Sequence, residues 1–212
     1  MTAAPLTLVC FAMKEEAKPF LERSKGKAGI KAIVTGIGQL NSERSIKKSL
    51  ETEKPNLVLT CGFAGGLRVG LKLGDVLFSA EKDSALETKL NAAGAAPGNF
   101  HCARRIAVTS AQKRALRDET RADAVEMESG FVCAICAQRG IPVATVRVIL
   151  DTVEEDLPLD FNQLAKQDQE MDYWKLTKAL IKSPGKVGSL LRLQKISHQA
   201  ACRLADVLVQ VI

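Results

Sequence analysis

The sequence predicts a single α/β domain: three layers, with a central mixed, mostly parallel twisted sheet flanked by helices. Apolar, β-rich segments alternate with helical ones along the chain. Several of the apolar segments are unbroken, as strands are when both faces of a sheet are covered. A chain of 212 residues with 46% hydrophobic content is suited to one globular domain.

The elements follow in order from these patterns. Strands are expected over 6–12, 30–38, 56–67, 74–80, 105–110 and 141–151. Helices are expected over 15–23, 41–52 and 125–138, the last ending at Gly140. Residues 84–104 are small, Gly/Ala-rich and weakly patterned, which indicates a loop on the ligand side of the sheet.

The C-terminal part is basic, and we divide the chain into a main α/β domain over 1–172 and a helical segment over 173–212. Six leucines and isoleucines fit helices on either side of an S-P-G break: Leu176, Leu180, Leu190, Leu191, Leu193 and Ile196. Seven basic residues stand against one acid, Asp206, and account for the whole net charge of +6: Lys175, Lys178, Lys182, Lys186, Arg192, Lys195 and Arg203. The segment either docks on the sheet or lies on an anionic membrane surface.

Composition narrows the class of protein. No apolar run approaches the 18 residues of a membrane span, and no signal peptide is recognised, so we expect a cytoplasmic protein, with peripheral membrane contact as the alternative. The six cysteines are then expected to be reduced. Cys133 and Cys136 form a lone C-x-x-C without the second pair that a zinc site needs. Aromatic content is only 4%, and no motif indicates nucleic-acid binding.

Carboxylates stand where strands end. Glu16, Glu128 and Asp151 lie near the ends of predicted elements, beside the glycine loops T-G-I-G and C-G-F-A-G-G-L. Ligands of α/β sheets bind beyond the carboxyl ends of the strands. Paired carboxylates without histidine suggest acid/base work on a glycosidic or similar bond. Strand-end caps and tight turns remain the alternative explanation.

An ordered set of motifs resembles the nucleoside phosphorylase and nucleosidase superfamily. The motifs are A-M-K-E-E, T-G-I-G, C-G-F-A-G-G-L, G-D-V-L, A-V-E-M-E-S and R-V-I-L-D, and they cover most of residues 6–163. The likeness is greatest to the methylthioadenosine/S-adenosylhomocysteine nucleosidase and hopanoid-associated branches. The tail S-P-G-K-V-G-S-L-L-R-L-Q-K-I and K-R-A-L look most like the hopanoid-associated proteins.

The resemblance implies roles for five residues. Glu128 would hold the ribose hydroxyls and Met127 would pack against the sugar, although core packing also explains a methionine there. Asp151 would donate a proton to N7 of the purine, and Glu16 would activate water. Phe161 would cover the base, or else serve as a core aromatic.

Further residues of the site follow from the strand ends. Arg147 precedes Asp151 by four residues, so alternation places both on one face of the strand. Backbone N–H groups of Ala64 and Gly65 could contact the base or an oxyanion. Phe63 stands where relatives often carry a hydroxyl, which argues against phosphate binding. The stretch between Asp75 and Glu126 is shorter than in typical nucleosidases, which suggests a more open pocket.

The sequence thus favours an enzyme that cleaves the N-glycosidic bond of an adenine nucleoside with a bulky 5′ substituent, such as adenosylhopane. Water or phosphate is the nucleophile, and phosphate would then be a co-substrate. Alternatives are a methylthioadenosine/S-adenosylhomocysteine nucleosidase, a futalosine hydrolase, or an inactive nucleoside-binding or membrane-associated protein. We expect no metal or organic cofactor, no nucleic-acid partner, and a homodimer.

Overall fold

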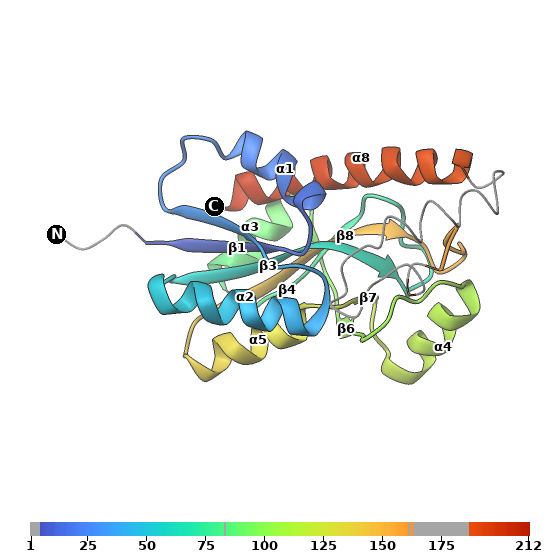
Figure 1. The fold of residues 1–212 in the computed structure, drawn as a ribbon, viewed down its shortest axis with the longest axis horizontal. Helices are drawn as coiled ribbons and strands as arrows, with labels where there is room; N and C mark the ends of the chain where they lie inside the picture. Colours follow the sequence, from blue (N-terminus) through green and yellow to red (C-terminus); the bar gives the residue numbers. More distant parts are fainter. Residues whose placement is uncertain (1–4, 83, 161, 163–186) are drawn as a thin grey trace.

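A computed structural model describes residues 5–82, 84–160, 162 and 187–212 of the chain (Figure 1). One β-sheet lies between two layers of helices. Helices α1, α3 and α8 cover one face, and α2 and α5 cover the other. The helices are α1 (Lys14–Arg23), α2 (Gly38–Thr52), α3 (Ala85–Ala92), α4 (Ser110–Thr120), α5 (Ser129–Gln138) and α8 (Val187–Val211).

The sheet is mixed and mostly parallel, as predicted. Its strands are β1 (Thr7–Phe11), β2 (Ile30–Val34), β3 (Leu57–Gly66), β4 (Val76–Ser79), β5 (Ala96–Pro97), β6 (Phe100–Cys102), β7 (Ala124–Glu126) and β8 (Val143–Asp151). The main path runs β2-β1-β3-β8-β4-β5, and β7 joins β6 to the end of β3. The pairs β3–β7 and β4–β8 are antiparallel, and the other pairs are parallel.

The carboxyl ends of the central strands form one edge of the sheet. Strands β1, β3 and β8 are parallel neighbours, so Met13, Phe63 and Asp151 follow or end strands on the same side. The register between β3 and β8 shifts where Ala64 pairs with Ile149 and Gly65 pairs with Asp151. This β-bulge re-aims the last residues of β8 at the edge where ligands bind in α/β folds.

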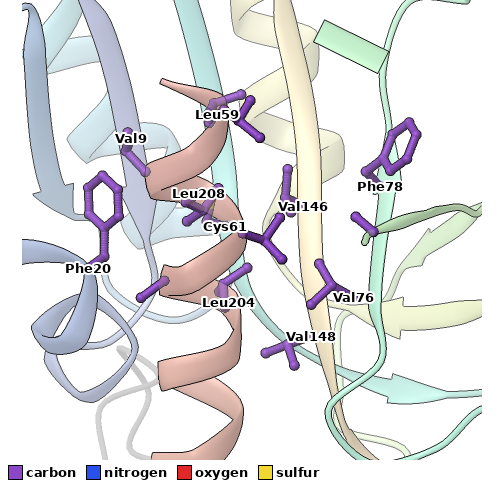
Figure 2. Packing of buried hydrophobic residues seen from close by; sticks show 14 of the residues in the cluster. Val9, Phe20, Leu59, Cys61, Val76, Phe78, Val146, Val148, Leu204 and Leu208 are labelled. Atoms are coloured by element: carbon purple, nitrogen blue, oxygen red, sulfur yellow. The ribbon is translucent and has the colours of Figure 1, made fainter. Parts of the chain in front are cut away.

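Helix α8 is part of the main hydrophobic core. Leu204 and Leu208 point into a cluster with Phe20 of α1 and Val146 of β8 (Figure 2). Burying each such side chain contributes roughly 1.5–3 kcal/mol. The described end of the basic segment therefore docks on the sheet, one of the two arrangements that we expected.

The arrangement of the first part of the C-terminal segment stays a prediction. Residues 163–186 lie outside the described residues, and with them Leu176, Leu180, Lys175, Lys178, Lys182 and Lys186. The division of the chain at residue 172 therefore stays a prediction. In the first half of α8, Arg192 and Lys195 are exposed and Leu191 is 62% exposed. No described helix is long and apolar enough to cross a membrane.

Three predicted elements were wrong. Residues 84–104 are not a loop: they contain α3, β5 and β6. Residues 105–110 do not form a strand, because Thr109 instead caps α4, its hydroxyl accepting from Gln112 N at 3.2 Å. The helix expected from Val125 begins only at Ser129, because residues 124–126 form β7 and pair with Gly65 and Gly66.

All six cysteines are free thiols. Cys10, Cys61 and Cys136 are buried, and Cys102, Cys133 and Cys202 are partly buried. Cys133 Sγ lies 3.8 Å from Thr145 Oγ1 rather than in a metal site. No group of three or more His, Cys, Asp or Glu side chains among the described residues is arranged to hold a metal ion.

Candidate active site

A cavity of about 290 Å³ opens at the carboxyl ends of β1, β3 and β8. This volume is at the lower end of the range typical of small-molecule sites. Seven residues predicted from the sequence line it: Glu16, Phe63, Ala64, Gly65, Met127, Glu128 and Asp151. The structure therefore brings together carboxylates that are up to 135 positions apart in the chain.

Glu16 reaches the cavity from the first turn of α1. It is 3% exposed. Its Oε2 accepts the N–H of Met13 at 2.9 Å, which caps the helix, and its Oε1 accepts the N–H of Phe63 at 2.8 Å. Burial raises the pKa of this carboxyl to about 7, against the opposing effects of Arg147 and the two N–H donors. Glu16 is thus poised to exchange a proton near neutral pH.

Glu128 is held at the junction between β7 and α5. Its Oε1 accepts the N–H of Gly38 at 2.9 Å, and its Oε2 lies 3.5 Å from Arg147 Nη2. The first of these contacts comes from the glycine loop T-G-I-G. Burial raises the pKa of Glu128, and Arg147 opposes the rise. A carboxylate offers about four lone-pair directions, so acceptor capacity remains for a ligand hydroxyl.

Glu126 also lines the cavity, and it holds the backbone at the start of α5. Its carboxylate accepts the N–H groups of Glu128 at 3.0 Å and Ser129 at 2.8 Å, and the Ser129 hydroxyl at 2.6 Å. These contacts cap the N-terminus of α5, where negative charge is favoured. Although burial alone would raise the pKa of Glu126, Arg147 and these donors bring it below its usual value.

Arg147 is the cation that holds the glutamates together. It is 1% exposed, and its Nη2 lies 2.5 Å from Glu126 Oε2 and 3.3 Å from Thr60 Oγ1. Burial alone would lower the pKa of Arg147, but Glu126, Glu128 and Glu16 together hold it above its usual value. One guanidinium among three buried carboxylates leaves the cluster short of positive charge. This shortage favours a proton on Glu16 or Glu128.

Gly62 leaves space for this network because it has no side chain. A Cβ atom there would lie 2.7 Å from Arg147 Nη1 and 2.7 Å from Glu16 Oε1. The residue also has φ +152°, which L side chains rarely adopt. Only glycine therefore lets β3 pass between the arginine and the glutamate.

Asp151 has a different partner. Its Oδ2 forms an ion pair with Lys113 Nζ on α4, and the lysine side chain is fully buried. Burial raises the pKa of Asp151, Lys113 lowers it, and Glu155 raises it, with a net rise. The carboxyl is therefore a weaker acid than a solvated aspartate, and it retains a proton to higher pH.

Comparisons with known proteins agree with this geometry. Residues 80–182 match the family model described as the phosphorylase superfamily. The 5′-methylthioadenosine/S-adenosylhomocysteine nucleosidase of Actinobacillus succinogenes is 27% identical over 187 residues, covering 69% of this chain and 81% of the relative. The corresponding nucleosidase of Geobacillus kaustophilus is also 27% identical, over 67% of this chain and 76% of the relative.

Over residues 80–182 the chain is similar to the phosphorylase superfamily.

Solved structures show the same fold. Futalosine hydrolase of Helicobacter pylori matches with a TM-score of 0.71 at 18% identity, over 98% of this chain and 97% of that one. The 5′-methylthioadenosine/S-adenosylhomocysteine nucleosidase of Campylobacter jejuni matches with a TM-score of 0.72 at 18% identity, over 98% of both chains. The resemblance inferred from the motifs is thus confirmed. The family model and the nucleosidase relatives indicate an enzyme that acts on N-glycosyl bonds.

Two predicted residues are placed differently from the rest. The bulge in β8 interrupts the alternation from which we expected Arg147 and Asp151 to share a face, and the two side chains bind different partners. Arg147 lies behind the glutamates that line the cavity. Phe161 lies outside the described residues.

Several residues of the site were not predicted from the sequence. Lys113 was counted only as part of K-R-A-L. Ile106 lines the cavity, and both its N–H and its carbonyl are bound by the Asn162 side-chain amide, at 2.9 and 3.0 Å. Leu193 and Ser197 of α8 also line the cavity. Leu193 was predicted only as an apolar position of a helix, and the sequence did not show which face of that helix would meet the site.

Proposed function

We propose that this protein hydrolyses the N-glycosidic bond of an adenine nucleoside that carries an apolar 5′ group, with 5′-methylthioadenosine as the type. The named nucleosidase relatives support the class of substrate. The cavity supports it too, because carboxylates reach it from three elements and apolar side chains complete its wall.

The contact between Glu16 and the N–H of Phe63 is the observation that favours water over phosphate as the nucleophile. A glycine loop that binds phosphate presents free N–H groups to the anion. Here a buried carboxylate already accepts one of these N–H groups and would repel a second anion at close range. The same carboxylate is placed to take a proton from water. Because its pKa is raised to about 7, it is a stronger base than a solvated glutamate.

Glu128 and Met127 are proposed to hold the sugar. A carboxylate with one oxygen on Gly38 N and the other near Arg147 is fixed in orientation before a ligand arrives. Two vicinal hydroxyls could both donate to it. Met127 lines the cavity beside Glu128 and offers an apolar surface to the ribose. Phe63, Ala64 and Gly65 would line the base side.

Asp151 is proposed to protonate N7 of the purine as the bond to the sugar breaks. The electron pair of the C–N bond goes to the base, and the proton lets the base leave neutral. A positioned acid of this kind contributes about 10²–10⁴-fold in rate. The raised pKa of Asp151 supports this role, because the group must be protonated to act.

An adenine nucleoside with a bulky lipid-like 5′ group, as in adenosylhopane, is the second candidate. It is favoured by the first half of α8, where Leu193 and Ser197 reach the cavity and Leu191 is 62% exposed. Peripheral membrane contact through the basic segment belongs with this candidate, and binding to anionic vesicles at low but not high salt would support it. A futalosine hydrolase remains a third substrate class, and the expected homodimer stays a prediction.

A substrate screen tests the proposal. The purified protein is incubated with 5′-methylthioadenosine, S-adenosylhomocysteine, a 5′-long-alkyl adenosine and futalosine, and the free base is quantified. We expect the highest kcat/KM for 5′-methylthioadenosine and little turnover with Asp151→Asn. Preference for the long-alkyl compound would establish the second candidate. No base released from any of the four would contradict the proposal.

A further inference from the structure

Lys113 is a fully buried lysine whose ammonium contacts three acceptors. It forms the ion pair with Asp151 Oδ2, and it donates to the carbonyls of Thr152 at 2.8 Å and Glu155 at 2.6 Å. Two of its N–H groups thus have carbonyl acceptors, and the positive charge pairs with the carboxylate. Lysine is almost never fully buried unless it is paired in this way.

The burial of this charge is not explained by helix packing. Other polar residues on α4 are at the surface, and Arg114, the next residue, is exposed. Taking an ammonium out of water costs several kcal/mol, whereas an apolar side chain of similar length would fill the same space without that cost. The acceptors at Asp151, Thr152 and Glu155 all belong to the end of β8 and the turn after it.

The carboxyl of Asp151 is fixed from two sides. Oδ2 is buried and its contact with Lys113 is an ion pair without hydrogen-bond geometry, and the side chain as a whole is 14% exposed. Gly65 also lies close to the carboxyl, because an added Cβ there would stand 3.3 Å from Oδ2 and 3.6 Å from Oδ1. Oδ2 is thus committed to the lysine, and Oδ1 is the oxygen left for a ligand in the cavity.

We propose that Lys113 is a positioning residue for Asp151: it fixes the carboxyl with Oδ1 toward the cavity and stabilises the negative charge that develops when Asp151 gives up its proton. This inference rests on the proposed role of Asp151 as the acid. In the step, the Oδ1–H bond breaks, an N7–H bond forms, and the carbon–nitrogen electron pair moves to the base. The new carboxylate lies beside an ammonium that is already in place, so no solvent has to reorganise.

The charge of Lys113 has a second consequence, for the pH profile. Lys113 on α4 and Glu155 in the turn after β8 are the charged groups that act on Asp151, with opposite signs. Removing the lysine leaves burial and Glu155, both of which raise the pKa of Asp151. The acid must be protonated, so activity is lost as the pH rises through this pKa. Without Lys113 that loss should occur at higher pH.

The test compares Lys113→Met, Lys113→Arg and, as a control on the same helix, Arg114→Met. We expect Lys113→Met to lower kcat by about 10–100-fold with little change in KM, because a small misplacement of a reacting group is costly. The high-pH limb of the pH–rate profile of Lys113→Met should move to higher pH. Lys113→Arg should keep the high-pH limb at the wild-type pH, because the positive charge is retained, but its kcat should be lower than that of the wild type. Arg114→Met should match the wild type in all three respects.

A carbon-13 NMR titration of the Asp151 carboxyl separates this inference from the proposed function. It reports the protonation of Asp151 whether or not the protein cleaves any nucleoside. We expect the titration to move to higher pH in Lys113→Met and to stay in place in Lys113→Arg. An unchanged titration in Lys113→Met would overturn the inference. If Lys113→Met does not fold, wild-type kcat in Lys113→Arg would overturn it. A wild type without nucleosidase activity would instead refute the proposed function.

Discussion

Replacing Gly62 by alanine tests how tightly the strand passes between the two charged partners of the site. The added Cβ would lie 2.7 Å from both Arg147 Nη1 and Glu16 Oε1, at φ +152°. Backbone strain costs about 1–3 kcal/mol. Overpacking costs about another 1–3 kcal/mol. We therefore expect Gly62→Ala to lower the free energy of unfolding by about 2–6 kcal/mol.

Gly70→Ala is the matched control, because Gly70 has φ +90° but no atom of the other described residues lies within 4 Å of the added Cβ. Gly70→Ala should show the free-energy cost of backbone strain without the cost of steric overlap. Urea denaturation gives both free energies of unfolding, and turnover of 5′-methylthioadenosine gives the effect on the site. Gly62→Ala should be less stable than Gly70→Ala by about 1–3 kcal/mol and much less active. Equal stability and full activity of the two variants would refute the claim that Gly62 separates Arg147 from Glu16.

Three further predictions concern the charged groups. Arg147→Met leaves buried carboxylates without their cation and should cost about 3–5 kcal/mol in urea denaturation; a smaller loss than that of Gly70→Ala would argue against the network. In the proposed mechanism Glu16 is the base, so its pKa of about 7 should set the midpoint of the low-pH limb of kcat/KM. Glu16→Gln should remove this limb, and survival of the limb would assign it to another group. Asp151→Asn should bind substrate almost normally but lose most turnover, whereas Glu128→Gln should weaken substrate binding and also slow turnover. Measuring kcat and the dissociation constant of the substrate separates these effects. If both variants changed kcat and the dissociation constant equally, the distinct roles of Asp151 and Glu128 would be contradicted.

The residues at the strand ends of the site could be predicted because a buried parallel strand is recognisable from its own short run of apolar residues. The unbroken apolar runs before Phe63 and Asp151 place these residues at one edge of the sheet whatever the order of the strands. Glu16 follows from the same argument through the first strand. The ordered motifs then linked these residues to a known superfamily.

Features that depend on distant pairing could not be predicted. β7 is three residues long and exists because it pairs with Gly65 and Gly66, so its sequence looked like the start of a helix. The stretch 84–104 is small and weakly patterned, and its short strands β5 and β6 owe their place to β4 and β7. A lysine on a helix is usually solvated, and only the position of Asp151 shows why Lys113 is buried.

The product formed from 5′-methylthioadenosine, with and without phosphate, tests most directly whether Glu16 directs water to the sugar. We expect adenine and free methylthioribose to appear in phosphate-free buffer, and added phosphate to change neither the rate nor the product. Glu16→Gln should lower the rate by about 10²–10⁴-fold. Strict dependence on phosphate, with a sugar 1-phosphate as product, would contradict it.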